Sequence, residues 1–344
     1  MVYIFKNVFY THKLNAIGGV ESWLYYLSLI YKDFVIFYKV GDEEQVKRLA
    51  KNVEVRKYQK PIKCKRFFCS YGYDTEVEAE EYYHVVHYDP LNIKFTPLQH
   101  EGFKYIGVSK VACYGFEKRT GNKCELIYNP VPIKKLGVPK KEGLNLISAT
   151  RLTSEKGGER INKLAKILDD KGIQYHWTIY TNKIRYKFNS PNIEVKEQKL
   201  DLTKEIEESS YLVQLSDCES FGLSVCESLI LGTPVIITDL KAFKEIGCKH
   251  GENAVVVDFD LSNVDIDLIV KNDMKFDYIP PKENWNKYLS KEDIYNPNEL
   301  VKVRTLKRLW LMEEDKHYLR NQVIEVKKQK ASELEAKEYA EWLY

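Results

Sequence analysis

Residues 217–236 read D-C-E-S-F-G-L-S-V-C-E-S-L-I-L-G-T-P-V-I, and this stretch decides the fold. The apolar run at residues 211–215 predicts a strand, the apolar spacing of residues 222–231 predicts a helix, and residues 234–238 predict a second strand. A strand, a helix and a further strand in succession form the unit of a parallel sheet that carries helices on its faces. We therefore expect an α/β protein.

Two carboxylates belong to this strand–helix unit. Glu219 lies in the loop after the strand, and Glu227 lies more than one turn into the helix. Phe221, Gly222 and Leu223 open that helix, whose free N–H groups and positive dipole end favour an anion such as a phosphate. Each carboxylate can bind a pair of vicinal hydroxyls. For either glutamate alone, the alternative is a solvated side chain on an ordinary strand–helix unit.

A second polar segment, residues 148–161 (S-A-T-R-L-T-S-E-K-G-G-E-R-I), places two cations after another predicted strand. Arg151 follows that strand directly, and Lys156 lies in a loop that ends in two glycines. Because the carboxyl ends of parallel strands share one edge of a sheet, both cations are expected on the same edge as Glu219. Arg, through its planar fork, and Lys, as a point charge, suit a diphosphate. The alternative is that Lys156 is surface charge and the glycines only shape a turn.

The third segment, residues 15–21 (N-A-I-G-G-V-E), joins the first predicted strand to the first predicted helix. Gly18 and Gly19 permit a ligand to approach the backbone at a helix N-terminus. Paired glycines alone are a weak signal because turns use them often. The dinucleotide-binding fingerprint is excluded because its third glycine is absent.

The alternation of strands and helices runs twice along the chain. Before a proline-rich segment at residues 129–143, strands are predicted at 2–9, 34–38, 67–71, 83–87 and 105–108, and helices at 21–31 and 109–119. After it, strands are predicted at 144–148, 176–180, 211–215, 234–238 and 254–258, and helices at 158–171 and 222–231. The segment carries three prolines, two glycines and four lysines without periodicity, which is typical of a linker. We predict two doubly wound Rossmann-like domains that face a cleft, residues 1–136 and 137–295, plus a small C-terminal β-hairpin and helix module, residues 296–344.

Composition and charge exclude several classes of protein. The chain has 344 residues, of which 44% are hydrophobic, so it is not generally disordered. The net charge of +3 divides into +6, −4 and +1 over the three predicted units, which supports treating them separately. Seven cysteines without a C-x-x-C pair argue for reduced thiols rather than a disulfide scaffold or a zinc ribbon. Neither a secretion signal nor an apolar run of the ~20 residues that a membrane span needs is predicted, so we expect a cytoplasmic protein whose membrane contact is at most peripheral.

Taken together, the three polar segments resemble the retaining GT-B glycosyltransferases of family 4. The resemblance covers roughly residues 1–290 and is most specific at residues 148–161 and 219–235. It implies a nucleotide-diphosphate sugar as the donor, UDP-linked, and transfer of a hexose or N-acetylhexosamine to a hydroxyl with retention of the anomeric configuration. It implies no cofactor besides this donor substrate.

The resemblance also implies roles for individual residues. Arg151 and Lys156 are similar to the pair that holds the donor diphosphate and stabilises its charge as the glycosidic bond breaks. Glu219 is similar to the carboxylate that binds the donor-sugar hydroxyls, and Glu227 to the one that binds the ribose. The other donor-binding positions that the resemblance implies are Gly18, Gly19, Phe221, Gly222 and Leu223.

A histidine is implied as the fourth catalytic residue. His87, in H-V-V-H-Y-D-P, is similar to the active-site histidine at a strand end of the first domain. His84 is its competitor and is expected inside the strand, whereas His87 precedes the loop start Asp89-Pro90 and is expected to be better exposed to the cleft. A lone histidine is otherwise more often structural.

The resemblance implies no metal ion. Arg, Lys and helix N-termini neutralise the diphosphate, a role that metal ions play in other folds. The D-x-D sequences at residues 258–260 and 265–267 superficially resemble a metal motif, but their late position in the second domain predicts solvated loop aspartates.

Residues 46–67 hold nine basic side chains and a single acid, Glu54. This stretch suits an anionic membrane face, a phosphate-rich acceptor or nucleic acid. The alternative, a solvated lysine face, is favoured over any one of these.

The tail is predicted to form a hairpin from residues 301–309 and 318–326 and an amphipathic helix over residues 330–343. It weakly resembles a short module of tailed-phage proteins, which implies a phage-encoded enzyme in the infected host with a phage structural protein as a partner. The alternative is an added element that docks on the enzyme or mediates self-association.

The leading hypothesis is thus a retaining, metal-independent glycosyltransferase that acts on a protein or glycan hydroxyl, with a phage virion protein as one acceptor. Transfer to modified phage DNA or to a surface polymer is an alternative, as is a nucleotide-sugar epimerase on the same fold. A non-catalytic, virion-associated binding protein is the third hypothesis. The oligomeric state is not indicated.

Overall fold

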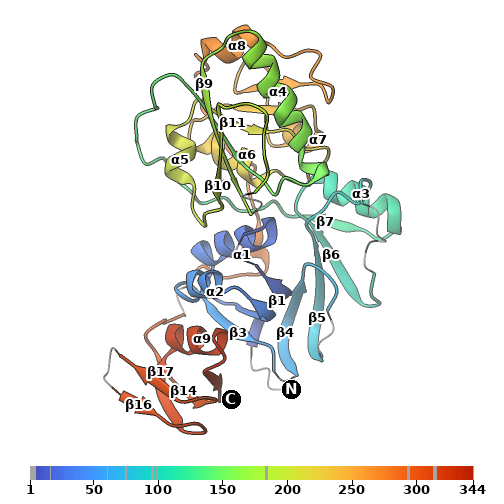
Figure 1. The fold of residues 1–344 in the computed structure, drawn as a ribbon. Helices are drawn as coiled ribbons and strands as arrows, with labels where there is room; N and C mark the ends of the chain where they lie inside the picture. Colours follow the sequence, from blue (N-terminus) through green and yellow to red (C-terminus); the bar gives the residue numbers. More distant parts are fainter. Residues whose placement is uncertain are drawn as a thin grey trace.

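The structure is a computed structural model that describes residues 5–343 except 16, 60, 74–75, 94–96, 98, 183–184, 293–294 and 313–315. Two α/β domains lie one above the other, and a small third unit lies beside the first domain, next to α2 and β3 (Figure 1). In the described part of the chain, no helix combines the length and the hydropathy of a membrane span.

The first domain is built on a seven-stranded parallel sheet in the order β3-β2-β1-β4-β5-β6-β7. Its strands are β1 (Phe5–Leu14), β2 (Val35–Gly41), β3 (Glu54–Lys57), β4 (Ile62–Cys69), β5 (Val77–Val86), β6 (Phe103–Gly107) and β7 (Cys124–Leu126). Its helices are α1 (Gly19–Ile30), α2 (Glu43–Ala50) and α3 (Lys110–Thr120). Side-chain caps fix two helix starts, because Asp42 accepts from Gln45 N and Ser109 accepts from Ala112 N. The predicted strand at 2–9 falls partly on residues 2–4, which lie outside the described residues.

One face of this sheet departs from the expectation of a sheet covered by helices on both faces. All three helices of the domain contribute to one apolar cluster, which also contains Phe9 and Phe68. The cluster on the opposite face contains only strand and loop residues, among them Tyr10, Phe37 and Phe67. The expectation is wrong for this face in the described residues, since the β3–β4 and β4–β5 connections are too short to contain a helix.

The second domain repeats the design with a six-stranded parallel sheet, β10-β9-β8-β11-β12-β13. Its strands are β8 (Leu144–Ala149), β9 (Tyr175–Thr181), β10 (Ile193–Glu197), β11 (Tyr211–Gln214), β12 (Val235–Thr238) and β13 (Ala254–Val257). Its helices are the 3-10 turn η1 (Ser154–Lys156), α4 (Gly158–Asp170), α5 (Thr203–Glu208), α6 (Leu223–Ile230), α7 (Lys241–Glu245) and α8 (Ile266–Lys271). In both sheets the strand order reverses beside the first strand of the domain, the arrangement of doubly wound folds.

A segment after α8 returns to the first domain. Trp285, in the 3-10 turn η2 (Trp285–Lys287), is fully buried, and its Nε1 donates to the carbonyl of Tyr128. Tyr31 donates to Glu283, and Ser290 N donates to Asp33. Residues 283–290, which belong to the predicted second domain, are thereby attached to the first.

The C-terminal unit has its own apolar core around Val303 and Trp342. Its strands are β14 (Leu300–Thr305), β15 (Leu309–Leu311), β16 (Lys316–Tyr318), β17 (Val323–Lys327) and β18 (Ala340–Trp342), and its helix is α9 (Lys328–Ala336). β14 and β17 pair antiparallel as predicted, but a separate β15–β16 hairpin lies between them. The helix predicted over 330–343 is wrong at its end, because the chain turns at Glu338, with φ 59°, into β18.

Candidate functional site

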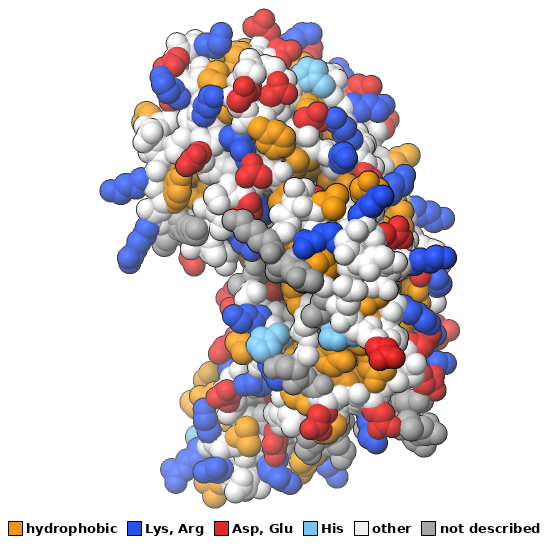
Figure 2. Space-filling model, turned by 90° about the vertical axis from the view of Figure 1, so that its right-hand side faces the viewer, with side chains coloured by type: hydrophobic (Ala, Val, Ile, Leu, Met, Phe, Trp, Pro, Cys, Tyr) orange, Lys and Arg blue, Asp and Glu red, His pale blue; other side chains and the backbone are white. Residues whose placement is uncertain are grey.

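The predicted site residues gather at the carboxyl edges of the two sheets, beside the points where the strand order reverses. The glycine loop follows β1, Arg151 and Lys156 follow β8, and Glu219 follows β11. The molecular surface is hollowed on one side between the upper and lower parts (Figure 2). In open α/β sheets, ligands bind outside the carboxyl ends of the strands at such positions.

A direct ion pair joins the two most specific segments. Lys156 Nζ lies 2.6 Å from Glu219 Oε1, and the two side chains are 18% and 15% exposed. Oε1 also accepts hydrogen bonds from Gln214 Nε2 (3.1 Å) and Ser216 Oγ (2.9 Å). Within the described residues the second oxygen, Oε2, accepts none. Three donors therefore fix the carboxylate while one oxygen is left for a ligand.

The backbone holds these two loops together. Gly157 has φ +76°, and a Cβ there would lie 1.9 Å from the carbonyl oxygen of Leu215, so only glycine fits. Asp217 N donates to the carbonyl of Glu155 (2.8 Å), and Arg160 pairs with Asp217 (2.6 Å). The glycine after Lys156 thus permits the close approach that brings this lysine to Glu219.

Arg151 lies on the same loop but is not part of the ion pair. Its side chain is 64% exposed, and its guanidinium is 3.9 Å from Glu155. It remains available at the edge of the sheet, as a ligand-binding cation requires.

The start of α6 is a second rigid element. Gly222 has φ +86°, and a Cβ there would meet the ring of Phe243 at 2.7 Å. Phe221 is buried, Leu223 is partly buried, and no side chain caps the helix. The first N–H groups of α6 therefore lack a side-chain acceptor.

Glu227, on α6, is brought to the opposite domain. Its Oε1 accepts a hydrogen bond from the hydroxyl of Tyr26 on α1 at 2.7 Å. Burial raises the pKa of Glu227, and burial together with the neighbouring carboxylate raises the pKa of Tyr26 well above its usual range. The predicted ribose-binding carboxylate therefore also holds the two domains together.

The glycine loop after β1 closes on itself. Glu21 Oε1 accepts from both the backbone N and the side-chain Nδ2 of Asn15 at 3.0 Å. A Cβ at Gly18 would lie 2.2 Å from Glu21 Oε2, whereas a Cβ at Gly19 meets nothing within 4 Å. Gly18 is thus required by the loop itself, and Gly19 borders open space.

His87 differs from its expected exposure to the cleft. Its ring packs on Trp23, with 4.4 Å between centroids, and its Nε2 is buried without a hydrogen-bond partner among the described residues. Burial lowers the pKa of His87 to about 3, so the ring is neutral. Its backbone carbonyl accepts from Ser220 Oγ (2.8 Å), next to Glu219. His84 lies buried inside β5 as expected.

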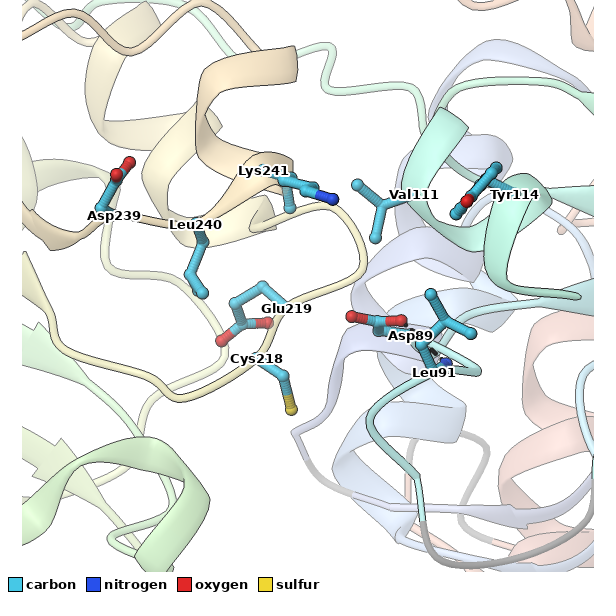
Figure 3. A pocket seen from close by; sticks show the side chains of 10 residues that line it. Asp89, Leu91, Val111, Tyr114, Cys218, Glu219, Asp239, Leu240 and Lys241 are labelled. Carbon is cyan, nitrogen blue, oxygen red and sulfur yellow. Dashed lines mark hydrogen bonds between the residues drawn. The ribbon is translucent and has the colours of Figure 1, made fainter. Parts of the chain in front are cut away.

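A cavity of about 170 Å³ lies between the domains in front of Glu219 (Figure 3). The first domain contributes Asp89 and Tyr114, and the second contributes Lys241 and Leu240. The sequence analysis assigned no role to these four residues. For Asp89 a signal exists, because it follows β5 at the same sheet edge as the other site residues.

A carboxylate of the second domain caps a helix of the first. Glu245 on α7 accepts from the backbone N–H groups of Lys110 (2.6 Å) and Val111 (3.2 Å) at the start of α3. A carboxylate at a helix N-terminus is favourable both as a cap and toward the helix dipole. This contact fixes the wall of the cavity to which Val111 and Tyr114 belong.

No group of three or more His, Cys, Asp or Glu side chains arranged for a metal ion occurs among the described residues. Asp258 and Asp260 are exposed, and Asp265 caps α8 by accepting from Leu268 N. The D-x-D sequences thus lie on the surface, as expected.

Residues 133–274 match the family described as Glycosyl transferases group 1. The whole fold is similar to the crystal structure of Anabaena HepE in complex with UDP and glucose, at 13% identity and a TM-score of 0.60, over 77% of this chain and 89% of that one. It is also similar to the lipopolysaccharide outer core galactosyltransferase WaaB (13% identity, TM-score 0.52, 79% and 92% covered) and to a glycosyltransferase from Rickettsia africae (14%, 0.52, 74% and 85%). No curated protein matches the sequence. The chain therefore has the GT-B glycosyltransferase fold that the sequence predicts, and most of its second domain matches the group 1 glycosyl transferases.

Proposed function

We propose that this protein is a retaining glycosyltransferase that moves a hexose or N-acetylhexosamine from a UDP-sugar to a hydroxyl. The observation that carries the proposal is the fixed Glu219 carboxylate, held by Lys156 at 2.6 Å in the cleft with one oxygen free. The group 1 match over residues 133–274 includes both residues, and the similar HepE structure holds UDP and glucose.

In this proposal, Lys156, the exposed Arg151 and the uncapped start of α6 hold the diphosphate. Oε2 of Glu219 accepts from a hydroxyl of the donor sugar. The acceptor oxygen forms a bond to the anomeric carbon on the face from which the diphosphate departs. The bond between that carbon and the diphosphate oxygen breaks with its electron pair on the diphosphate, which also takes the acceptor's proton.

Charge stabilisation and positioning are then the work of the protein. The neutral, buried His87 fits a positioning role beside the sugar better than proton transfer, because its pKa of about 3 lies far below the working range. We propose that the reaction needs no metal ion, since two cations and a helix N-terminus meet the diphosphate.

The proposed acceptor is a protein or glycan, and the proposed setting is the cytoplasm. The separately folded C-terminal unit supports a recruiting role, for which a phage structural protein remains the proposed partner. Family 4 membership also remains a proposal that rests on the quoted motifs.

The test is incubation of the protein with UDP-, GDP- and ADP-linked hexoses and N-acetylhexosamines, with release of nucleotide as the readout. Mass spectrometry of candidate acceptors and NMR of the product's anomeric proton then give the sugar and the stereochemistry, and a parallel reaction in EDTA tests the metal. Isomerised donor without an acceptor would indicate an epimerase. Neither binding nor turnover of any donor would indicate a non-catalytic binding protein.

A further inference from the structure

The cavity between the domains carries more information than the proposed reaction requires. We infer that it receives the acceptor, and that this acceptor is the hydroxyl of an uncharged sugar rather than of a phosphate-bearing polymer. The inference rests on the proposed glycosyltransferase function and narrows its acceptor class.

Two carboxylates face each other across the cavity. Asp89 comes from the first domain and Glu219 from the second, and both point into the space between them (Figure 3). Asp89 is held in place, because its Oδ1 accepts from Leu91 N (3.0 Å) and its Oδ2 accepts from Asn92 Nδ2 (2.5 Å). Each oxygen keeps a further lone pair for a ligand hydroxyl. A sugar between them can donate to both carboxylates at once.

The charge of the lining is acidic. Asp239 is a third carboxylate in the cavity, although Lys244 pairs with it at 2.5 Å. Lys241 is the single cation that lines the cavity in the described part of the chain. A phosphate or carboxylate on the acceptor would therefore meet Asp89 and Glu219 as like charges, which is a strong element of specificity.

The first-domain wall is apolar where it is open. Tyr114 on α3 is 54% exposed and Leu91 is 51% exposed, and both line the cavity. An aromatic face beside fixed carboxylates suits a sugar ring, whose C–H face is apolar and whose edge is a row of hydroxyls. The volume of about 170 Å³ leaves room for one ring and not for a polymer backbone.

The basic stretch at residues 46–67 offers a polyanion less than its composition indicates. Arg56 pairs with Glu54 and lies 4.3 Å from the Trp342 ring of the C-terminal unit. Lys57 pairs with Glu338 of the same unit at 2.8 Å. Lys63 and Arg66 pair with Glu78 and Glu81. Much of this charge therefore serves to dock the C-terminal unit and to cross-link strands.

The test compares methyl glycosides of glucose, galactose and N-acetylglucosamine with their 6-phosphates as acceptors, using the UDP-sugar that the donor panel selects. The wild-type enzyme should use at least one neutral glycoside with a kcat/KM at least 100-fold above that of its 6-phosphate. Asp89→Asn should raise the acceptor KM at least tenfold and reduce this discrimination. Tyr114→Ala should raise the acceptor KM by a similar factor, and Tyr114→Phe should restore it.

Asp170→Asn, an exposed change at the end of α4, is the matched control and should leave all these values unchanged. Binding of UDP, measured by calorimetry, shows that each variant retains a folded donor domain. Preference for a phosphorylated acceptor, or donor hydrolysis without transfer to any neutral glycoside, would overturn the inference alone. Absence of donor turnover in the wild-type protein would overturn the proposed function, and the inference with it.

Discussion

Lys156 Nζ and Glu219 Oε1 lie 2.6 Å apart, although 63 residues separate them in the chain. The cation proposed for the diphosphate and the carboxylate proposed for the sugar are therefore neighbours before any donor is bound. Each holds the other's side chain in position, as a preorganised site requires. A donor that binds here extends an existing charge arrangement and does not create one.

Lys156→Ala and Glu219→Gln should each lower kcat/KM for the UDP-sugar, by about 100-fold or more, because each removes preorganised charge in the cleft. Their effects should be far from additive in the double variant, since both depend on one contact. Nucleotide release measures the loss, and Lys166→Ala, which removes an exposed α4 cation paired with Asp170, is the control. Full activity in either single variant would contradict the assignment.

Gly19 and Gly222 should respond differently to alanine. At Gly222, φ is +86° and Phe243 lies 2.7 Å from the new Cβ, so Gly222→Ala should lower the free energy of unfolding by about 1–3 kcal/mol. At Gly19 nothing lies within 4 Å, so Gly19→Ala should leave the midpoint of urea unfolding in place and raise the donor KM. Urea unfolding followed by donor kinetics separates the two. A Gly19→Ala variant with unchanged donor KM would place the diphosphate elsewhere.

Tyr26→Phe removes a hydroxyl that bridges the domains while leaving the ring in place. Because this hydroxyl donates to Glu227 at 2.7 Å, its loss leaves a partly buried carboxylate with one donor fewer. We expect a donor KM raised about three- to tenfold, equivalent to about 1 kcal/mol. Tyr25→Phe, at the neighbouring position where the ring packs under Arg48, is the control. Equal effects of the two substitutions would argue against a specific Tyr26–Glu227 contact.

Local pattern was sufficient for much of this architecture. The strands around Lys156 and Glu219 are short apolar runs bounded by glycine loops, and parallel sheets bring such loops to one edge. The fold follows from that rule without knowledge of distant contacts. The same rule, applied to β5, also points to Asp89.

What the sequence could not predict depends on residues far apart in the chain. The burial of His87 is due to Trp23 on α1, and the engagement of Glu227 is due to Tyr26, 201 residues away. The cations of residues 46–67 look free in the sequence because their partner Glu338 is 281 residues from Lys57. Composition reports charge, but only tertiary packing decides which charge is exposed.

The docking of the C-terminal unit should weaken as the pH rises. Glu335 on α9 is 3% exposed, and its carboxylate accepts from Lys57 N (2.5 Å) and Gln59 Nε2 (3.2 Å). Burial raises the pKa of Glu335 to about 8, although the Lys57 N–H acts in the opposite direction. A carboxyl whose pKa is higher in the folded state holds its proton there and loses it on unfolding, so its stabilisation is complete below its ordinary pKa and disappears as the pH rises through 8.

The free energy of unfolding should therefore fall by about 2 kcal/mol between pH 5 and pH 7, at about 1.4 kcal/mol for each pH unit. Glu335→Gln should flatten this dependence, because the amide keeps the shape and carries no charge. Glu338→Gln, which removes an exposed carboxylate of the same unit, should leave the slope unchanged. Urea unfolding monitored by tryptophan fluorescence, to which the buried Trp342 at this interface contributes, measures all three proteins. A wild-type slope equal to that of Glu335→Gln would mean that Glu335 is ionised in the docked state.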